Sequence, residues 1–382
     1  LTLPDPAHLD SPFEVGIVDV PGHADFVNNM VAGVGGMDLA LFVVAADDGW
    51  MPQSEEHLHI LSYLGVERAV IALSKADLAE DVEFAVEFVR ECLEGTAFGD
   101  APIVPVAATQ GQGLEDLQSA LVSRLAQATP SPDFGKPLLP IDRAFTVKGI
   151  GTVVTGTLSG GRLQTGDRLV MQPDGSPCSV RSIQNHSEAV DTAHPGMRAA
   201  LSLPELPVAA KGRPGAHRGA FLTIPEAGRP SATVNLLIHR LGREIPGQPA
   251  TRRPLPSARR VRIHHGAGSV GGRLFFLEGR NLAPGESKLA QLRLDEPAFM
   301  MLGDRLVIRD WSGEATLAGG VVLETEAPRR GIRAEKQVRF LQARAAGVDD
   351  PRTLLRPLLE RDHAIDLVAA TEHFRLPPAE IE

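Results

Sequence analysis

The residues Asp19-Val20-Pro21-Gly22-His23 combine three kinds of group that can act together on a bound phosphate. They end an apolar run, so we expect them at the carboxyl end of a buried strand, where α/β sheets bind ligands. Asp19 can hold a metal ion through a bound water, and the N–H of Gly22 can approach a terminal phosphate without a side chain in the way. His23 can then orient an attacking water. The pattern also fits an ordinary strand–turn–helix junction.

A second motif, Ser74-Lys75-Ala76-Asp77, follows a later apolar run. The Asp77 carboxylate can accept two hydrogen bonds from the N1–H and 2-amino group of guanine, and adenine lacks that pair of donors. The stem of Lys75 can cover the plane of the base. Lysine and aspartate are also common in surface loops, so this motif alone does not fix a function.

A third element, Ala107-Ala108-Thr109, follows the apolar run 102–106 and can offer a backbone N–H to the O6 of guanine. Three strand ends in this order, each suited to one part of the same nucleotide, predict a GTP site with a Mg²⁺ ion held by Asp19 through water. His23 is the predicted catalytic residue. The predicted GTP- and magnesium-binding residues are Asp19, Gly22, Ser74, Lys75, Asp77, Ala107 and Ala108.

These motifs need a parallel sheet to bring the strand ends together. Runs that are continuously apolar predict buried strands at 13–20, 40–46, 69–74 and 102–108. Amphipathic patterns predict helices at 52–64, 80–96 and 114–127. Alternating strands and helices indicate a parallel sheet with crossover helices, which we assign to a first domain over residues 1–130.

The pattern changes after a proline-rich segment at 128–140. Short alternating strands separated by glycine turns then predict two antiparallel β-barrels, over residues 137–227 and 229–326. A further change at 327–331 introduces helical patterns, which we assign to the start of another domain over residues 333–382.

Composition limits the class of protein. The chain has 382 residues, a formal net charge of −10 and 43% hydrophobic residues, which suits several soluble domains. No apolar run approaches the roughly 20 residues of a membrane span, and residues 1–15 lack the pattern of a signal peptide. The two cysteines, Cys92 and Cys178, suit a reducing compartment, so we expect a cytoplasmic protein without membrane contact.

The charge is unevenly distributed. Residues 229–280 contain ten arginines and two acidic residues, so an acidic protein carries one strongly basic segment. Such a segment can bind RNA locally, and it can equally be a solvated barrel face. Within it, Arg259, Arg260, His264 and His265 are candidates for a weak RNA contact, which the family resemblance given below would make a contact with tRNA.

The stretch DVPGHADFVNNMVAGVGGMDLALFVVAADDGWMPQSEEHLHIL at 19–61 resembles the switch II helix and following strand of translational GTPases. Its AGVGGMD and VVAADDGWMPQ segments are most similar to the selenocysteine-specific elongation factors. The resemblance continues through IDRAFTVKGIGTVVTGTLSGG at 141–161 in the second domain. It reaches IHHGAGSVGGRLFFLE and RDWSGEATLAGGVVLE in the third, so it covers residues 13 to about 330.

The resemblance implies a P-loop GTPase domain, two β-barrels and the start of a winged-helix region. It implies a factor that binds GTP and selenocysteinyl-tRNA, delivers the tRNA to the ribosome at recoded UGA codons with GTP hydrolysis, and recognises an mRNA hairpin. A selenolate is an anion at neutral pH, so fixed cations would recognise it. The resemblance places that role on Arg143 and Arg198, with Asp142 holding an arginine or the aminoacyl amine.

The sequence also departs from the family. It contains no G-x-x-x-x-G-K-[ST] phosphate loop, because Gly135-Lys136 is followed by proline, and the switch I threonine segment is missing. Ser74 stands where GTPases usually carry asparagine. Without the phosphate cradle we expect this chain to bind GTP poorly and to hydrolyse it negligibly.

Three interpretations remain open at this point. We favour a selenocysteine-specific factor truncated at both ends. Another translational GTPase, either a general aminoacyl-tRNA carrier or an initiator-tRNA carrier, would end near Glu326, whereas this chain continues into helices. A non-catalytic RNA-binding remnant is the third interpretation.

Overall fold

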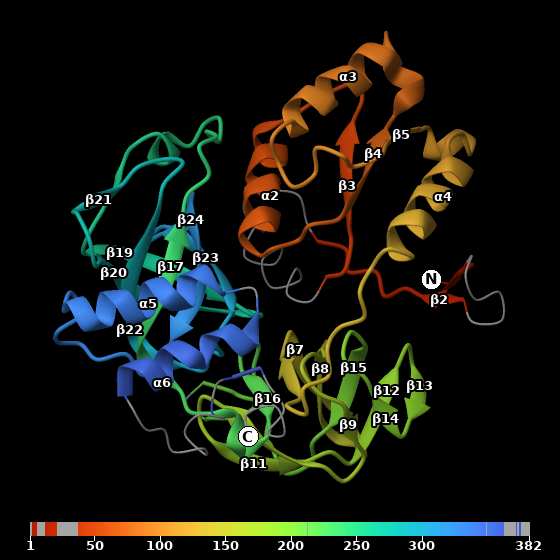
Figure 1. Cartoon of the computed structure of the whole chain (residues 1–382). Helices are drawn as coiled ribbons and strands as arrows, with labels where there is room; N and C mark the ends of the chain where they lie inside the picture. Colours follow the sequence, from red (N-terminus) through yellow and green to blue (C-terminus); the bar gives the residue numbers. More distant parts are fainter. Residues whose placement is uncertain are drawn as a thin grey trace.

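A computed structural model describes residues 2–5, 12–20, 37–211, 213–348 and 350–362, together with residues 372, 374 and 375. The described chain forms an α/β part, two β-barrels and a short helical part (Figure 1). None of the helices in these ranges is long and apolar enough to cross a membrane.

The α/β part is built on three parallel strands in the order β3-β4-β5. Their bounds are β3 Ala40–Ala45, β4 Ala69–Ser74 and β5 Ile103–Val106, and those of the helices are α2 Pro52–Tyr63, α3 Val82–Leu93 and α4 Leu114–Leu125. Helices α2 and α3 cover one face of the sheet, and α4 covers the other (Figure 1). These elements lie within a few residues of the predicted ones, because continuous apolar runs are buried on both faces of a parallel sheet.

The predicted strand at 13–20 is wrong over most of its length. Only β2 Phe13–Glu14 is a strand, and it pairs with β1 Thr2–Leu3. Residues 15–20 have no strand neighbour among the described residues, and Ile17 is 69% exposed. An apolar run becomes a buried strand only where a neighbouring strand satisfies its backbone groups. Strand β3 is the edge of the described sheet, and its Leu41 and Val43 are also exposed.

The second part is a barrel of two main sheets, in the orders β11-β10-β16-β6 and β13-β12-β15-β8-β7. A small pair, β14-β9, completes it. The strand bounds are β6 Leu138–Pro140, β7 Arg143–Val147, β8 Gly151–Thr157, β9 Leu163–Gln164, β10 Arg168–Gln172, β11 Ser176–Ser179, β12 Ser182–Asn185, β13 Glu188–Val190, β14 Thr192–Ala193, β15 Arg198–Ser202 and β16 Phe221–Thr223.

The third part is a closed barrel in the order β17-β22-β20-β19-β23-β24, with a small pair β18-β21 at one end. Its core is almost entirely aliphatic and contains Leu236, Ile263 and Leu292. The strand bounds are β17 Ser231–His239, β18 Leu255–Pro256, β19 Arg259–His265, β20 Gly268–Phe276, β21 Asn281–Leu282, β22 Ser287–Ala298, β23 Arg305–Asp310 and β24 Thr316–Glu324.

In the part of the C-terminal region that the structure describes, helices α5 Glu335–Ala346 and α6 Arg356–Asp362 follow the third barrel. Helix α5 packs Phe340 and Leu341 against apolar side chains on the outside of the barrel, among them Leu289 and Leu323. The guanidinium of Arg344 is buried and donates to the carbonyl oxygens of Leu323 and Leu354. The helices are therefore fixed to the third barrel (Figure 1).

Candidate functional site

The second and third motifs meet at one edge of the α/β sheet. Strands β3, β4 and β5 are in parallel register, with Ala45 beside Ser74 and Ser74 beside Val106. The residues that follow each strand therefore emerge at the same edge. That edge, formed by residues 46–50, 74–78 and 107–113, is called the strand-end edge below.

Lys75 and Asp77 each have a partner across the strand-end edge. Lys75 has a left-handed backbone conformation, with φ of 55°. Its Nζ lies 2.8 Å from Oδ2 of Asp47 and 3.4 Å from Oδ2 of Asp48. The Lys75 hydrogen bond holds the pKa of Asp47 below its ordinary value. The Nε2 of Gln110 donates to Oδ2 of Asp77 at 3.0 Å, which ties the second motif to the third.

The third motif is a tight loop. The N–H of Ala107 donates to the carbonyl oxygen of Gln112 at 3.0 Å, whereas Ala108 is exposed. Ala108 is therefore the better placed of the two predicted residues to present its N–H to a ligand. Gly113 has φ of 75°, and a Cβ there would lie 2.1 Å from the carbonyl oxygen of Pro105. Only glycine allows the loop to turn into α4 at this point.

Of the other residues predicted to bind the nucleotide, the structure describes Ser74 and Asp19. The Oγ of Ser74 donates to the carbonyl oxygen of Val44 at 3.3 Å, so this hydroxyl braces β4 against β3. Asp19 is exposed. One exposed carboxylate suits Mg²⁺, which keeps several waters and takes its other ligands from phosphates. Gly22 and His23 lie outside the described residues, and their roles stay predictions.

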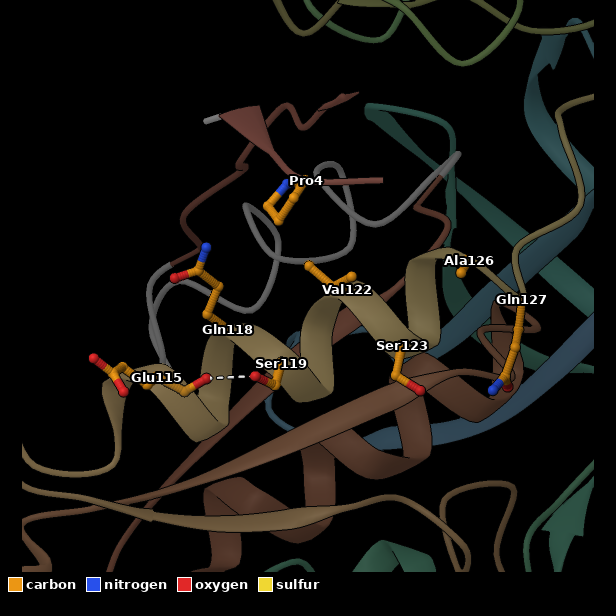
Figure 2. A pocket seen from close by; sticks show the side chains of 8 residues that line it. All are labelled: Pro4, Glu115, Gln118, Ser119, Val122, Ser123, Ala126 and Gln127. Carbon is orange, nitrogen blue, oxygen red and sulfur yellow. Dashed lines mark hydrogen bonds between the residues drawn. The ribbon is translucent and has the colours of Figure 1, made fainter. Parts of the chain in front are cut away.

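Two other features do not add to this site. Lys136 is buried, its Nζ donates to the carbonyl oxygen of Phe374 at 2.8 Å, and burial lowers its pKa to about 8. It joins the linker to the C-terminal segment and does not face the strand-end edge. Figure 2 shows a groove between Pro4 and the outer side of α4, where the Ser119 hydroxyl donates to the Glu115 carbonyl at 2.9 Å. No residue lining that groove belongs to the motifs.

The second barrel brings the predicted pocket residues together. Nη1 of Arg198 lies 2.6 Å from Oδ2 of Asp142, and the other carboxylate oxygen of Asp142 accepts a hydrogen bond from Thr155 Oγ1. Strand β8 lies between β7 and β15, with Arg143 opposite Thr155 and Arg198 opposite Thr157. Directly opposed residues share a face of the sheet, and so do positions two apart. Both arginines therefore belong to the outer face.

Arg143 and Arg198 differ in how they are held. Arg143 is exposed, and no other described residue pairs with its guanidinium. The Arg198 side chain is 32% exposed and is fixed by Asp142. Within the described part of the chain, the Arg198 charge is paired with Asp142 and the Arg143 charge is not, so an anion would be attracted more strongly to Arg143.

The weak tRNA-contact prediction needs correction at its histidines. His264 is 2% exposed, and burial, followed by the charges of Arg309 and Arg262, lowers its pKa to about 3. It lies opposite Val307, which belongs to the core that α2 forms on the outside of the barrel. His265 stacks on Phe221 of the second barrel, and its Nε2 lies 2.7 Å from Oδ2 of Asp304. Neither histidine is a surface contact, whereas Arg260 is exposed and Arg259 half-buried.

Comparison with known proteins gives the family. The model of the elongation factor Tu GTP binding domain matches residues 10–127, and that of the selenocysteine-specific elongation factor β-barrel domain matches residues 244–329. The selenocysteine-specific elongation factor of Desulfomicrobium baculatum is 40% identical over 323 residues, which are 83% of this chain and 49% of that protein.

This chain is a homologue of the selenocysteine-specific elongation factors.

Solved structures agree with this relationship. A bacterial selenocysteine-specific elongation factor, EF-Sec, superposes with a TM-score of 0.79 and 28% identity, covering 99% of this chain and 60% of that one. The elongation factor SelB of Methanococcus maripaludis, in complex with the GTP analogue GppNHp, gives a TM-score of 0.68 and 26% identity, covering 82% and 71%. The chain spans about half the length of the curated relatives it matches.

Sequence reasoning missed the contact between α2 and the third barrel of this elongation-factor homologue. Glu56 of α2 is 3% exposed. Its Oε1 accepts from Arg309 Nη2 at 3.1 Å and from Thr316 Oγ1 at 2.7 Å, and its Oε2 accepts from Gln248 Nε2 at 2.8 Å. All of its partners lie at least 190 positions away in sequence, so no local sequence pattern predicts these contacts.

The neighbouring Glu55 anchors the same helix. It accepts from Trp50 Nε1 at 2.9 Å and from Nε of Arg243 at 2.7 Å. Burial acts to raise its pKa, but hydrogen bonds from His59, Arg243 and Trp50 outweigh that effect and lower the pKa to about 2. Arg243 and the buried Arg240 both come from the basic segment, and Arg240 donates to carbonyl oxygens, including those of Leu317 and Leu282. Part of that segment therefore serves the fold and not RNA.

Proposed function

We propose that this chain is the GTP- and tRNA-handling part of a cytoplasmic selenocysteine-specific elongation factor. The whole factor would bring selenocysteinyl-tRNA to the ribosome at recoded UGA codons and hydrolyse GTP. The observation that carries the proposal is the strand-end edge, where Lys75, Asp77, Ala108 and Gln110 converge in a homologue of factors with that name. The GTP-analogue complex of a structural neighbour supports GTP as the nucleotide.

The strand-end edge would recognise the guanine base of the nucleotide. The carboxylate of Asp77 would accept the N1–H and 2-amino hydrogens of guanine, taking the place of the Gln110 hydrogen bond. Ala108 would offer its N–H to O6, and the aliphatic stem of Lys75 would cover the ring while its Nζ stays near Asp47 and Asp48. The Gln110–Asp77 hydrogen bond that the ligand would displace is exposed, so it costs little to replace.

The phosphates of GTP would be bound by residues of the first motif. Asp19 would hold Mg²⁺ through water, and that ion, when bound, supplies charge neutralisation at the phosphates. Gly22 would donate its N–H to the terminal phosphate, and His23 would orient the attacking water. Because this sequence contains no phosphate loop, we expect the chain itself to bind GTP weakly and to hydrolyse it negligibly.

The outer face of the second barrel would recognise the aminoacyl group. Arg143 and Arg198 would bind the selenolate by charge-assisted contacts. A seryl group carries no such charge and would leave Arg143 unpaired. Asp142 holds Arg198 in place and would keep that cation oriented. The helices α5 and α6 would begin the region that faces the mRNA hairpin.

The test is discrimination between selenocysteinyl- and seryl-tRNA by a full-length version of the protein. Changing Arg143→Ala should cut the preference for selenocysteinyl-tRNA by about tenfold or more, because one charge-assisted contact is lost. Arg168→Ala, at an exposed arginine on the other sheet of the barrel, is the matched control. Equal discrimination by both variants would contradict the pocket assignment.

A further inference from the structure

Two short turns lie next to each other at the strand-end edge, one after β4 and one after β5. The first turn, Ala76–Leu78, contains Asp77, and the second turn, Ala108–Gln110, ends at Gln110. Strands β4 and β5 are neighbours in the sheet, and their last residues are paired (Figure 1). The two turns therefore begin side by side.

The backbone of each turn is held by its own hydrogen bonds. The N–H of Leu78 donates to the carbonyl oxygen of Lys75 at 3.0 Å, and the N–H of Gln110 donates to that of Ala107 at 3.0 Å. Gly111, which follows, has φ of 74°, a conformation that favours glycine. Neither turn depends on the side chains of Asp77 and Gln110 for its shape.

The Gln110 side chain occupies one oxygen of the Asp77 carboxylate. Its Nε2 donates to Oδ2 of Asp77 at 3.0 Å. Among the residues that the structure describes, no other group donates a hydrogen bond to this carboxylate. Both side chains are exposed, so water can replace either partner and the net contribution of the bond is small. The contact can therefore open and close without disturbing the fold.

The Gln110 amide resembles the group that guanine would present to Asp77. The side-chain amide of glutamine and the 2-amino group of guanine both donate from a planar nitrogen. Guanine would donate its N1–H and 2-amino hydrogens to the two oxygens of the carboxylate, so it needs the oxygen that Gln110 holds. Hypoxanthine lacks the 2-amino group and offers N1–H alone. Oδ1 can accept that single bond while Gln110 stays on Oδ2.

We propose that Gln110 is a specificity-determining residue that competes with guanine for the Asp77 carboxylate. Without nucleotide, the Gln110 amide takes the place of the 2-amino group, and guanine binds only the fraction of molecules in which this amide has moved away. The apparent affinity for guanine is reduced by that fraction, whereas the affinity for hypoxanthine is not. Gln110 thus narrows the preference for guanine over hypoxanthine. The inference rests on the proposed function, because it requires guanine to bind at the strand-end edge.

The test measures binding of guanosine and inosine diphosphates to a full-length version of the protein by titration calorimetry. Gln110→Ala removes the competing donor and should raise the affinity for guanosine diphosphate roughly two- to tenfold, the range that one exposed hydrogen bond allows. The affinity for inosine diphosphate should not change. Gln110→Met keeps the length of the side chain without a donor and should behave like Gln110→Ala. Gln118→Ala, at an exposed glutamine on the outer side of α4, is the matched control and should bind both nucleotides as the wild type does.

A kinetic measurement separates competition from a change in the bound site. Because the Gln110 amide has to move before guanine binds, Gln110→Ala should raise the association rate of guanosine diphosphate and leave its dissociation rate unchanged. The Gln110 side chain is exposed and its turn is held by backbone bonds, so the variants are expected to fold.

Adenosine diphosphate distinguishes the two ways in which the account can fail. If the wild type bound it as tightly as guanosine diphosphate, the proposed function would be wrong, and this inference with it. If the wild type prefers guanine but Gln110→Ala binds guanosine diphosphate no better than Gln118→Ala does, the proposed function stands and the competition is refuted. Weaker binding by Gln110→Ala would refute it too, because it would show that Gln110 orients Asp77 for the base.

Discussion

The strand-end edge and the contact of α2 with the third barrel both rely on acid–base pairs, but the two differ in exposure. At the strand-end edge, the Lys75 and Asp47 side chains are 47% and 29% exposed. At the α2 contact, the Arg309 and Glu56 side chains are 2% and 4% exposed. Exposed ion pairs contribute little to stability and exchange partners readily. A buried charge that loses its partner lowers the stability of the folded protein strongly. The contacts at the strand-end edge, where a ligand is expected, can therefore be replaced by contacts with that ligand. The contacts between α2 and the third barrel are buried and hydrogen-bonded, which suits a permanent attachment of these two parts.

The largest effect is expected at the buried contact. Glu56→Ala should lower the free energy of unfolding by about 3–5 kcal/mol, because Arg309 is left buried without its carboxylate and Thr316 and Gln248 lose an acceptor. Urea denaturation followed by circular dichroism measures the change. Glu87→Ala on α3, whose side chain is 70% exposed, is the control and should cost less than about 0.5 kcal/mol. If Glu56→Ala were as stable as this control, the buried contact would not differ from the exposed ones in its contribution to stability, contrary to our account.

A smaller, pH-dependent effect should come from His264 behind that contact. Its pKa in the folded protein is about 3, against an ordinary value of 6.5, because of its burial and the charges of Arg309 and Arg262. The unfolded chain therefore takes up a proton below pH 6.5 that the folded chain does not, and stability falls as pH drops through this window. Between pH 7 and pH 4, the wild type should lose roughly 2–3 kcal/mol more than His264→Leu. His194→Leu, at an exposed loop histidine, is the matched control for the loss of a histidine side chain.

The smallest effect should come from the strand-end edge. Lys75→Ala removes the exposed contacts with Asp47 and Asp48 and should leave the free energy of unfolding close to the wild-type value, because exposed pairs contribute little to stability. Thermal unfolding and urea unfolding both measure this change in stability. A loss comparable with that of Glu56→Ala would show that the edge holds the fold and is not kept free for a ligand.

The sequence predicts the strand-end edge well and the surfaces between parts poorly. The runs 69–74 and 102–108 give β4 and β5 because parallel strands are apolar on both faces. The run 13–20 is also largely apolar, but beyond Glu14 it finds no partner strand among the described residues. His264 follows the outward phase of β19, as alternation predicts, and is buried only because α2 packs on that outer face. Burial of this kind depends on residues far apart in the chain.

The Asp77→Asn substitution tests the assignment of the strand-end edge to guanine most directly. In a full-length version of the protein, binding of guanosine and xanthosine diphosphates would be compared by competition. An asparagine amide cannot accept the N1–H and 2-amino hydrogens together, but it can donate to the C2 carbonyl of xanthine. We expect the variant to lose about tenfold or more in guanine affinity and to prefer xanthine. An Asp77→Asn variant that still prefers guanine would contradict the assignment.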